Sequence, residues 1–283
     1  MSLGLPVVIF AALAVWLGGW WLNWRLSRSD HPAARAAIPV IFGLTLLALW
    51  EIVVRGFAVP QVILPGPSAI AAAIAANTGL LWADFWQTVV RSVLPGYAIG
   101  CGAGIAVALA TDRSPFLQRG LLPIGTLAAA LPIVGIAPIM VMWFGFDWQS
   151  KAAVAALMCF FPMLVNTIQG LRAADRAEAE LLVTYAASYG QALRRLRWPA
   201  AMPFVFAGLK VCTTLALIGA IVAEFFGTPT VGIGFRISTG IGRLALDMVW
   251  AEIAVAALAG TAFYALVAAA ERAVTFWHPS MRG

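Results

Sequence analysis

The chain has 283 residues, of which 62% are hydrophobic and 11% are charged, and its mean hydropathy is +0.92. Soluble domains carry about 25% charged residues, and a soluble fold of this composition would expose one continuous apolar surface, so we exclude a soluble protein. The formal net charge is +6, but the basic side chains fall in short segments between apolar runs, where they indicate membrane topology and not nucleic-acid binding.

The apolar runs are long and continuous, which favours spanning helices over a barrel of short alternating strands. A bilayer core about 30 Å thick needs about 20 helical residues. We therefore predict an all-α polytopic transmembrane helix bundle in the cell inner membrane. Its seven expected spans are residues 5–24, 38–54, 93–110, 121–144, 152–169, 204–226 and 251–276.

Two segments near the N-terminal half need a separate interpretation. The first apolar run lacks a basic start and a small-residue cleavage site, so we expect it to span the membrane and not to be a signal peptide. Residues 82–92, between the second and third spans, predict an amphipathic helix lying at the membrane interface, with Trp82, Phe85 and Trp86 as anchors.

Basic residues set the predicted orientation, with the N-terminus outside and the C-terminus in the cytoplasm. The segments expected inside hold twelve arginines, whereas those expected outside hold five basic residues. The inside set is Arg25, Arg28, Arg35, Arg113, Arg119, Arg172, Arg176, Arg194, Arg195, Arg197, Arg272 and Arg282. The outside set is Arg55, Arg91, Lys151, Arg236 and Arg243, and Lys210 lies at the inner end of the sixth span.

Residues 172–203 form the longest polar stretch, and they are expected inside. Glu178 and Glu180 lie near the front of a helical run and Arg194, Arg195 and Arg197 near its end, which complements the helix dipole. Two prolines, Pro199 and Pro203, are expected to end that helix before the next span. The pattern alone fits a docking helix or a solvated connecting loop.

This stretch and the re-entry WPAAMPFVFAGLKV resemble the cytoplasmic "EAA" loop of binding-protein-dependent ABC importer permeases. Three further stretches resemble the nitrate/sulfonate/taurine branch of that family: VILPGPSAI, LPIVGIAPIMVMWFGFDWQSK and IVAEFFGTPTVGIG. The resemblance runs from Val59 to the C-terminus. It implies a six-helix permease core within residues 37–283, with residues 1–36 as an added span and linker.

The motif allows two registers. If Pro199 is the loop-ending proline of the family, Glu180 falls on its glutamate, Leu181 and Leu182 replace its two alanines, and Ala186 replaces its glycine. The other register uses Gly190 as the glycine, puts Thr184 at the glutamate and needs a gap, so we prefer the first. The resemblance implies an ATPase-coupling loop at residues 171–203 with Glu180, Leu181, Leu182, Ala186, Ala187, Gly190, Arg194, Arg195 and Pro199 as its site residues.

The resemblance also implies the partners. The loop helix would sit in a cleft of a separate ABC ATPase subunit, present in two copies, which binds ATP and Mg²⁺. This chain has no P-loop, since neither Lys151 nor Lys210 follows a glycine, so it is expected to hold no cofactor and to have no catalytic residues. A second permease subunit, in a homodimer rather than a heterodimer by preference, and an external substrate-binding protein complete the expected importer. Substrates of the branch include nitrate, sulfonates, taurine, thiamine-precursor pyrimidines and riboflavin-like compounds.

Polar and polarisable side chains within the spans are candidates for the substrate pathway. An ionisable group at depth is costly, so Glu224, two residues before the end of its expected span, is the first of them. The others share thioether, aromatic or amide chemistry: Met140, Trp143, Met158, Phe160 and Asn166. Cys101, Cys159 and Cys212 lie within apolar segments without disulfide or zinc spacing, so we expect packing residues and no metal site.

Two other classes of membrane protein compete with this interpretation. A membrane-embedded hydrolase needs a nucleophile with a base, or a metal cluster, whereas the two histidines, His31 and His278, lie in a loop and a tail. An ion-coupled secondary transporter acting without an ATPase favours charges at the midplane and two related halves. The acids here cluster at span ends and no repeat is evident, so this transporter is a stronger alternative than the hydrolase but weaker than the importer.

Overall fold

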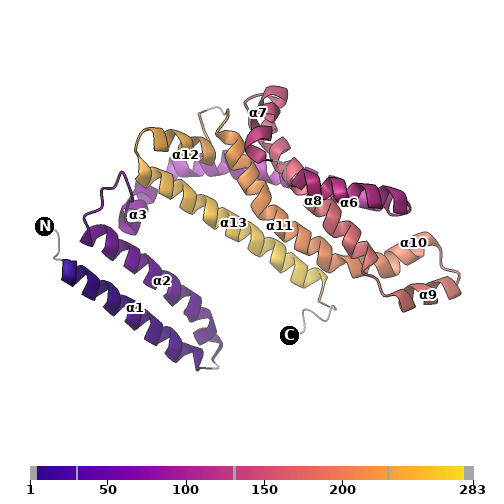
Figure 1. Ribbon diagram of the computed structural model, residues 1–283, viewed down its shortest axis with the longest axis horizontal. Helices are drawn as coiled ribbons and strands as arrows, with labels where there is room; N and C mark the ends of the chain where they lie inside the picture. The colour runs from indigo at the N-terminus through magenta and orange to yellow at the C-terminus, as the bar shows by residue number, and fades with distance from the viewer. Residues whose placement is uncertain (1–4, 30, 130–131, 228–229, 277–283) are drawn as a thin grey trace. The chain divides into compact units, whose positions relative to one another are not determined.

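The computed structural model describes residues 5–29, 31–129, 132–227 and 230–276, and every regular element among them is a helix (Figure 1). Six of these helices are long and apolar enough to cross a membrane, which confirms the all-α polytopic class. They cover Leu5–Ser27, Ala33–Gly56, Thr78–Thr111, Trp148–Arg172, Tyr189–Glu224 and Leu246–Val274.

The chain forms two compact units, the first made of residues 1–79 and 239–253. Here α1 (Leu5–Ser27) packs on α2 (Pro32–Gly56), and two glycines allow the approach, because a Cβ at Gly19 or Gly56 would overlap Thr45 or Val8. Large apolar side chains cover the rest of α1, including Phe10 and Trp20, as lipid contact requires. The helix is long and apolar enough to span a membrane, and its being an addition to a six-helix core stays a prediction.

In the same unit, α3 (Pro67–Ala76) begins beside the end of α2. The Glu51 carboxylate accepts hydrogen bonds from the backbone N–H of Ser68 at 3.0 Å and from its hydroxyl at 2.6 Å, and Arg55 pairs with the same carboxylate. Trp50 and Trp250 meet edge to face with ring centroids 5.0 Å apart.

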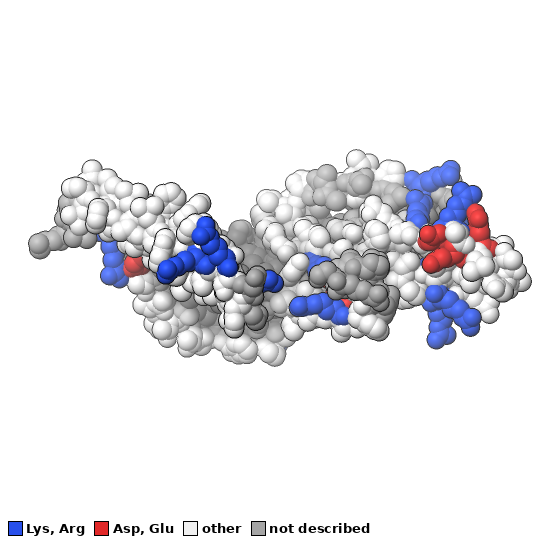
Figure 2. Space-filling view, turned by 90° about the horizontal axis from the view of Figure 1, so that it is seen from below, with Lys and Arg blue, Asp and Glu red and all other residues white. Residues whose placement is uncertain are grey.

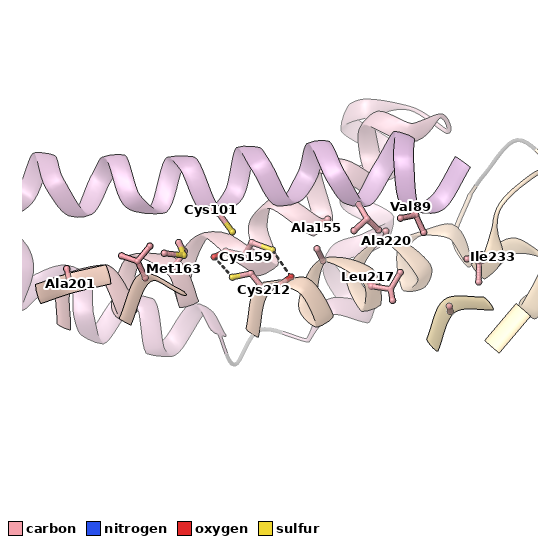
Figure 3. Close-up of a cluster of buried hydrophobic side chains, with 14 of the residues drawn as sticks. Val89, Cys101, Ala155, Cys159, Met163, Ala201, Cys212, Leu217, Ala220 and Ile233 are labelled. Atoms are coloured by element: carbon pink, nitrogen blue, oxygen red, sulfur yellow. Dashed lines mark hydrogen bonds between the residues drawn. The ribbon is translucent and has the colours of Figure 1, made fainter. Parts of the chain in front are cut away.

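The second unit, residues 80–238 and 254–283, has a core of three helices: α5 (Leu94–Thr111), α8 (Trp148–Arg172) and α11 (Trp198–Glu224). Gly96, Gly100 and Gly104 form a row on α5 against α8, and a Cβ on Gly96 would lie 2.6 Å from the carbonyl oxygen of Ala152. Small residues at this spacing let helix backbones approach in a membrane, where no hydrophobic effect drives helices together. Figure 3 shows the small apolar side chains, such as Ala155 and Ala220, that fill this core.

The C-terminal part of α13 (Leu246–Val274) packs on this core. The Tyr97 and Phe263 rings meet edge to face at 4.8 Å, and Leu217 lies against Gly260. Lys210 lies at the inner end of a predicted span, and its ammonium group pairs with the Glu271 carboxylate at 2.6 Å.

The prediction of a separate helix at the membrane interface over residues 82–92 is wrong. Its residues are helical, but α4 (Thr78–Phe85), the π-helical turn η1 (Trp86–Val93) and α5 form one continuous helix. The π turn accommodates the missing N–H of Pro95, which lies in the first turn of α5. The polar side chains that suggested a water-facing side, Asp84, Thr88 and Ser92, are buried in the protein.

The expected single spanning helix at residues 121–144 is also wrong. The region holds two shorter helices, α6 (Pro115–Ala129) and α7 (Ile133–Phe144), neither of which has the about 20 residues that one spanning helix needs. The chain still passes here from one end of the core to the other, because Asp112 before this region pairs with Arg197 and Lys151 after it bonds to Gly227. Pro132 is extended, with a ψ of 113°, and it caps α7. Because proline also disfavours a helical residue before it, an apolar run that contains it need not be one helix.

Pro199 and Pro203 do not end a helix, which corrects a third prediction. After α9 (Arg176–Thr184) and a turn, the chain is helical from α10 (Tyr189–Ala192) through the π-helical turn η2 (Leu193–Arg197) to the end of α11. The π turn again precedes a proline, Pro199, which lies in the first turn of α11. A short helix, α12 (Ile233–Gly242), follows α11.

Candidate functional site

The loop at residues 172–203 is built from two capped helices. Asp175 is the N-cap of α9, where its carboxylate accepts a hydrogen bond from the N–H of Ala177 at 2.7 Å. Ser188 and Gln191 form a reciprocal capping box at the start of α10. On α9, Arg176 pairs with the exposed carboxylate of Glu180 at 3.0 Å. The local sequence therefore explains a helix–turn–helix that protrudes from the long apolar helices.

The turn between these helices depends on an unusual backbone at Ala186, whose φ is +53°. The N–H groups of Ala186 and Ala187 donate to the carbonyls of Val183 and Leu182, at 2.9 and 3.0 Å, and so end α9. A left-handed residue at the end of a helix is usually glycine, because a Cβ is strained there. Ala186 thus occupies a conformation that favours glycine, which supports the register that aligns it with the glycine of the family motif.

Replacing Ala186 with glycine is expected to stabilise this turn by up to about 1 kcal/mol, because relief of the left-handed strain outweighs the extra freedom of glycine in the unfolded chain. Amide hydrogen exchange at Ala187 measures the effect as slower exchange, by up to about fivefold. The matched control is Ala187→Gly, outside the left-handed region, where faster exchange is expected. Equal changes in both variants would contradict the assignment of strain to Ala186.

Asp112, at the end of α5, joins the loop to the helix core. Its buried carboxylate accepts two hydrogen bonds from the Arg197 guanidinium, at 2.6 and 2.7 Å, and one from the Tyr189 hydroxyl. Arg197 also donates to the carbonyl of Leu171 at the end of α8, at 3.1 Å. A bidentate pair of this kind is strong and fixes geometry. The first turns after the loop are therefore fastened to both α5 and α8.

The outer part of the loop presents apolar side chains to its surroundings. Leu181, Val183 and Tyr185 are 55%, 76% and 75% exposed, although they lie outside the long apolar helices. The same loop carries Arg176, Glu178, Glu180, Arg194 and Arg195, and Figure 2 shows charged side chains gathered over the part of the second unit that carries α9 and α10. An exposed apolar patch with a charged rim is typical of a protein interaction site.

A second polar cluster lies at the other end of α11, where three side chains cap α12. The N–H groups of Gly232, Ile233 and Gly234 donate to Asp84, Thr88 and Glu224, at 2.6, 2.9 and 2.7 Å. These groups have no partner within a helix, and burial makes each unmet donor costly. We call Asp84, Thr88, Glu224 and the three N–H groups the α12 cap.

Side-chain contacts tie the α12 cap together. The Thr88 hydroxyl donates to the second oxygen of Glu224 at 2.8 Å, and Arg236 pairs with Asp84 at 2.9 Å. Glycine is required at two positions. Gly232 has a φ of +138° and faces the Glu224 carboxyl, and a Cβ on Gly234 would overlap the carbonyl oxygen of Ile221. Both carboxylates are buried, so they position α12.

Beside the α12 cap lies a groove of about 890 Å³. Its lining includes Trp82, Trp86, Gln87, Arg91, Phe146 and Asp147. Lys151 closes the adjoining turn, because its buried ammonium donates to the carbonyls of Phe146, at 2.6 Å, and Gly227. The Lys151 charge, counted above as a loop charge that sets topology, is thus part of the packed protein.

The two polar clusters lie at opposite ends of the same three core helices. The continuous helix of η1 and α5 runs from Thr88 in the α12 cap to Asp112 at the loop. In the opposite direction, α11 begins next to Arg197 at the loop and ends at Glu224 in the α12 cap. With 27 residues, α11 is about 40 Å long, which exceeds a bilayer core of about 30 Å. The loop and the α12 cap therefore lie toward opposite membrane faces.

The predicted pathway residues are placed as follows. Met140 and Met158 pack against the cluster of Ala137, Val154 and Ala223, and Phe160 meets Phe161 edge to face at 4.9 Å. The Asn166 amide donates to the carbonyl of Pro162 at 2.8 Å, and Trp143 is exposed. Glu224 is buried with both oxygens in hydrogen bonds. A role of these six residues in a pathway stays a prediction.

Sequence reasoning missed Asp112, Tyr189, Asp84 and Thr88. Only one signal was present for each acid, namely a carboxylate at the edge of an apolar run, where an ionisable group needs a partner. Their partners, Arg197 and Arg236, lie 85 and 152 residues away. No local pattern connects groups at such separations.

Comparison with known proteins now adds to this geometry. Residues 98–276 match the family described as binding-protein-dependent transport system inner membrane component. The riboflavin transport system permease protein RibX of Chloroflexus aurantiacus is 31% identical over 257 residues, which cover 90% of this chain and 94% of RibX. The formylaminopyrimidine transport permease protein ThiX of Halalkalibacterium halodurans is 30% identical, covering 86% of this chain and 96% of ThiX. The taurine transport system permease protein TauC of Escherichia coli is 28% identical, covering 90% and 93%.

Proposed function

The chain belongs to the family of binding-protein-dependent transport system inner membrane components, and from this premise we propose that it forms the membrane pathway of an ATP-driven importer for a small solute. It is a multi-pass permease of the inner membrane and a transporter component. The observation that carries the proposal is the protruding helix–turn–helix, which presents an apolar patch and is fastened by Asp112 to the ends of two core helices.

In the proposed mechanism a separate ATPase binds α9 and the turn after it. Leu181, Val183 and Tyr185 supply apolar contact area, and Glu180, Arg194 and Arg195 supply charges around it. The left-handed backbone at Ala186 supports the motif register that puts Glu180 at the contact. ATP and Mg²⁺ are bound by that ATPase, which is expected in two copies beside two copies of this permease.

The bidentate pair of Arg197 with Asp112 then transmits movement of the loop. When closure of the ATPase shifts α9 and α10, η2 and the start of α11 move with them, because Tyr189 and Arg197 are bonded to the end of α5. The end of α8 follows through the hydrogen bond from Arg197 to Leu171. Rigid helices then carry the shift across the bilayer, which is the physical basis of alternating access in such a bundle.

At the opposite face, a substrate-loaded binding protein is proposed to dock near α12. The loop is then cytoplasmic, with the N-terminus outside and the C-terminus inside, as the arginine distribution predicts. The α12 cap fixes a helix that such a partner would contact, and the groove with Trp82, Trp86 and Arg91 lies next to it. The binding protein selects the cargo, so this chain needs little affinity of its own.

The names of the relatives support a proposal for the class of cargo. They are named for riboflavin, formylaminopyrimidine, aliphatic sulfonates and taurine, which are small polar or heteroaromatic solutes. We propose that this permease carries a solute of one of these kinds. A panel of radiolabelled compounds, presented with a substrate-binding protein that co-purifies with the permease, identifies the cargo by ATP-dependent uptake into proteoliposomes.

A triple variant with serine in place of Leu181, Val183 and Tyr185 is expected to insert into the membrane but to lose co-purification of the ATPase, because the apolar contact is lost. The single variants Glu180→Arg and Ala186→Trp are expected to do the same. Arg176→Gln is the matched control: it removes an exposed ion pair worth about 0–1 kcal/mol and leaves the patch intact. Normal co-purification with the three serines would contradict docking at this patch.

The energy source of uptake distinguishes the proposed importer from an ion-coupled transporter. Proteoliposomes with the permease, the ATPase and the loaded binding protein should take up substrate only when ATP is enclosed with the ATPase. Uptake by the permease alone, driven by a proton or sodium gradient, would overturn the importer proposal.

A further inference from the structure

The three cysteines of the chain meet in the middle of the helix core, which their sequence positions did not predict. Cys101 comes from α5, Cys159 from α8 and Cys212 from α11, and their Sγ atoms all lie within 4.8 Å of one another (Figure 3). Their exposed fractions are 3%, 0% and 0%. Three soft ligand atoms from three different helices thus point at one place.

Close contact between two of the helices holds this arrangement. The Cys159 thiol donates to the carbonyl of Cys212, and the Cys212 thiol donates to the carbonyl of Cys159, each at 3.4 Å (Figure 3). These reciprocal bonds fix two sulfurs, and Cys101 brings the third from the glycine-rich helix α5. Apolar side chains such as Ala155, Ala216 and Met163 make up the cluster around them.

Apolar surroundings restrict what three thiols can bind. A net charge in a dry helix core is costly, so the favoured adduct is one whose total charge is zero. Three thiolates carry a charge of −3, which a monovalent or divalent metal leaves uncompensated. A trivalent centre that prefers sulfur gives a neutral product, and trivalent arsenic is the common centre of this kind.

We propose that Cys101, Cys159 and Cys212 form a binding site for trivalent arsenic, delivered as neutral arsenous acid, As(OH)₃. Three As–O bonds break and three As–S bonds form, and each thiol proton leaves with a hydroxide as water. The products are one As(S-Cys)₃ centre and three water molecules. No electron is transferred, and no charge is created in the core.

The geometry suits a small central atom. With sulfurs about 2.3 Å from a centre, as in zinc thiolates, the three sulfurs lie about 4 Å or less from one another. The observed upper limit of 4.8 Å needs a contraction of under an ångström, which side-chain rotation supplies. The adduct would also replace the two long S–H···O contacts with three covalent bonds across α5, α8 and α11.

Such an adduct fastens three helices together at the centre of the bundle. If the chain is the importer proposed above, the helices must shift relative to one another during transport, so arsenite is expected to arrest uptake. Binding itself rests only on the three thiols, whereas the effect on uptake rests also on the proposed function. The two are therefore measured separately.

The test uses the full-length permease, purified with its partner subunits in lipid nanodiscs and treated with sodium arsenite. Intact-protein mass spectrometry should find one arsenic added and three hydrogens lost per permease chain, with all three thiols protected from alkylation after denaturation. The midpoint of thermal unfolding should rise. Equimolar Zn²⁺, whose adduct with three thiolates is charged, should give no such rise.

Serine variants decide whether the three thiols act as one site. Because the third bond forms within a preorganised site, Cys101→Ser, Cys159→Ser and Cys212→Ser should each weaken arsenite binding by roughly 100-fold. Thermal unfolding without arsenite shows whether each variant is folded. Consumption of two thiols or fewer per arsenic, or equal binding by all three folded single variants and the parent, would overturn the site. Full binding with unchanged uptake would leave the site in place and contradict the importer mechanism.

Discussion

Replacing Asp112 with asparagine is expected to lower ATP-driven uptake by about tenfold or more while the ATPase still co-purifies with the permease. The substitution keeps the size of the side chain but removes the charge that pairs with Arg197 and accepts from Tyr189. Breaking a buried pair costs about 3–5 kcal/mol, and the 24% exposure of the Arg197 side chain lowers this to about 2–3 kcal/mol. The exposed face of α9 is untouched, so docking persists while movement is no longer transmitted.

Two further variants make the Asp112 experiment specific. Arg197→Lys keeps the positive charge but loses the bidentate fork, so intermediate uptake is expected. Glu178→Gln removes an exposed carboxylate from the same loop and should leave uptake within about twofold of the parent. If Asp112→Asn transported normally, or lost uptake only because the ATPase no longer bound, the fastening of the loop to α5 would not be the route of coupling.

Replacing Gly234 with alanine is expected to destabilise the α12 cap by about 3 kcal/mol. The new methyl group would overlap the carbonyl oxygen of Ile221 and lie 2.9 Å from the Cβ of Glu224. A backbone carbonyl inside a helix cannot move aside as a flexible side chain does, so α12 must shift and its bonds to Glu224 and Thr88 lengthen. Tryptophan fluorescence during thermal unfolding measures the loss.

Gly242, in the same short helix, provides the matched control. A Cβ there meets nothing within 4 Å, so Gly242→Ala should be neutral or slightly stabilising, by up to about 1 kcal/mol. If the α12 cap also holds the surface for the binding protein, Gly234→Ala will reduce stimulation of the ATPase by the loaded binding protein and Gly242→Ala will not. Equal stability of the two alanine variants would contradict the packing described for α12.

The sequence predicted those features that depend on composition and local pattern. Long apolar runs located the spans that became α1, α2, α5, α8, α11 and α13, because lipid forces backbone hydrogen bonds to close within each helix. The loop was predicted to be helical, but as one run, whereas Asp175 and Ser188 each cap a separate helix. The motif register received a physical reason only from the backbone of Ala186.

The wrongly predicted helix boundaries lie near prolines, where packing with the rest of the protein decides whether the helix continues. A helix end was expected at Pro199, and a separate interfacial helix was expected at residues 82–92. In both places a π turn before a proline lets the helix continue, and the sequence does not specify where such a turn forms. The opposite happened near Pro132, where an apolar run divides into α6 and α7. Both outcomes satisfy the same rule that proline lacks an N–H.

Contacts between distant residues account for the rest. The pairs Asp112–Arg197 and Thr88–Glu224, and the three converging thiols, each join positions on different helices. Their proximity depends on how each helix is rotated about its axis. Because these helices are apolar on all sides, the sequence does not indicate which face of each one packs inward. The row of Gly96, Gly100 and Gly104 was the one local signal for a packed face on α5.

Accessibility of the loop tests the central claim most directly. With the three native cysteines replaced by serine, a single cysteine at Val183, which is 76% exposed, reports which side of the membrane the loop occupies. A membrane-impermeant maleimide should label this cysteine in inside-out vesicles, fail to label it in right-side-out vesicles, and be blocked when the ATPase is bound. Labelling from the outside, or labelling unaffected by the ATPase, would contradict a cytoplasmic loop through which the ATPase drives the permease.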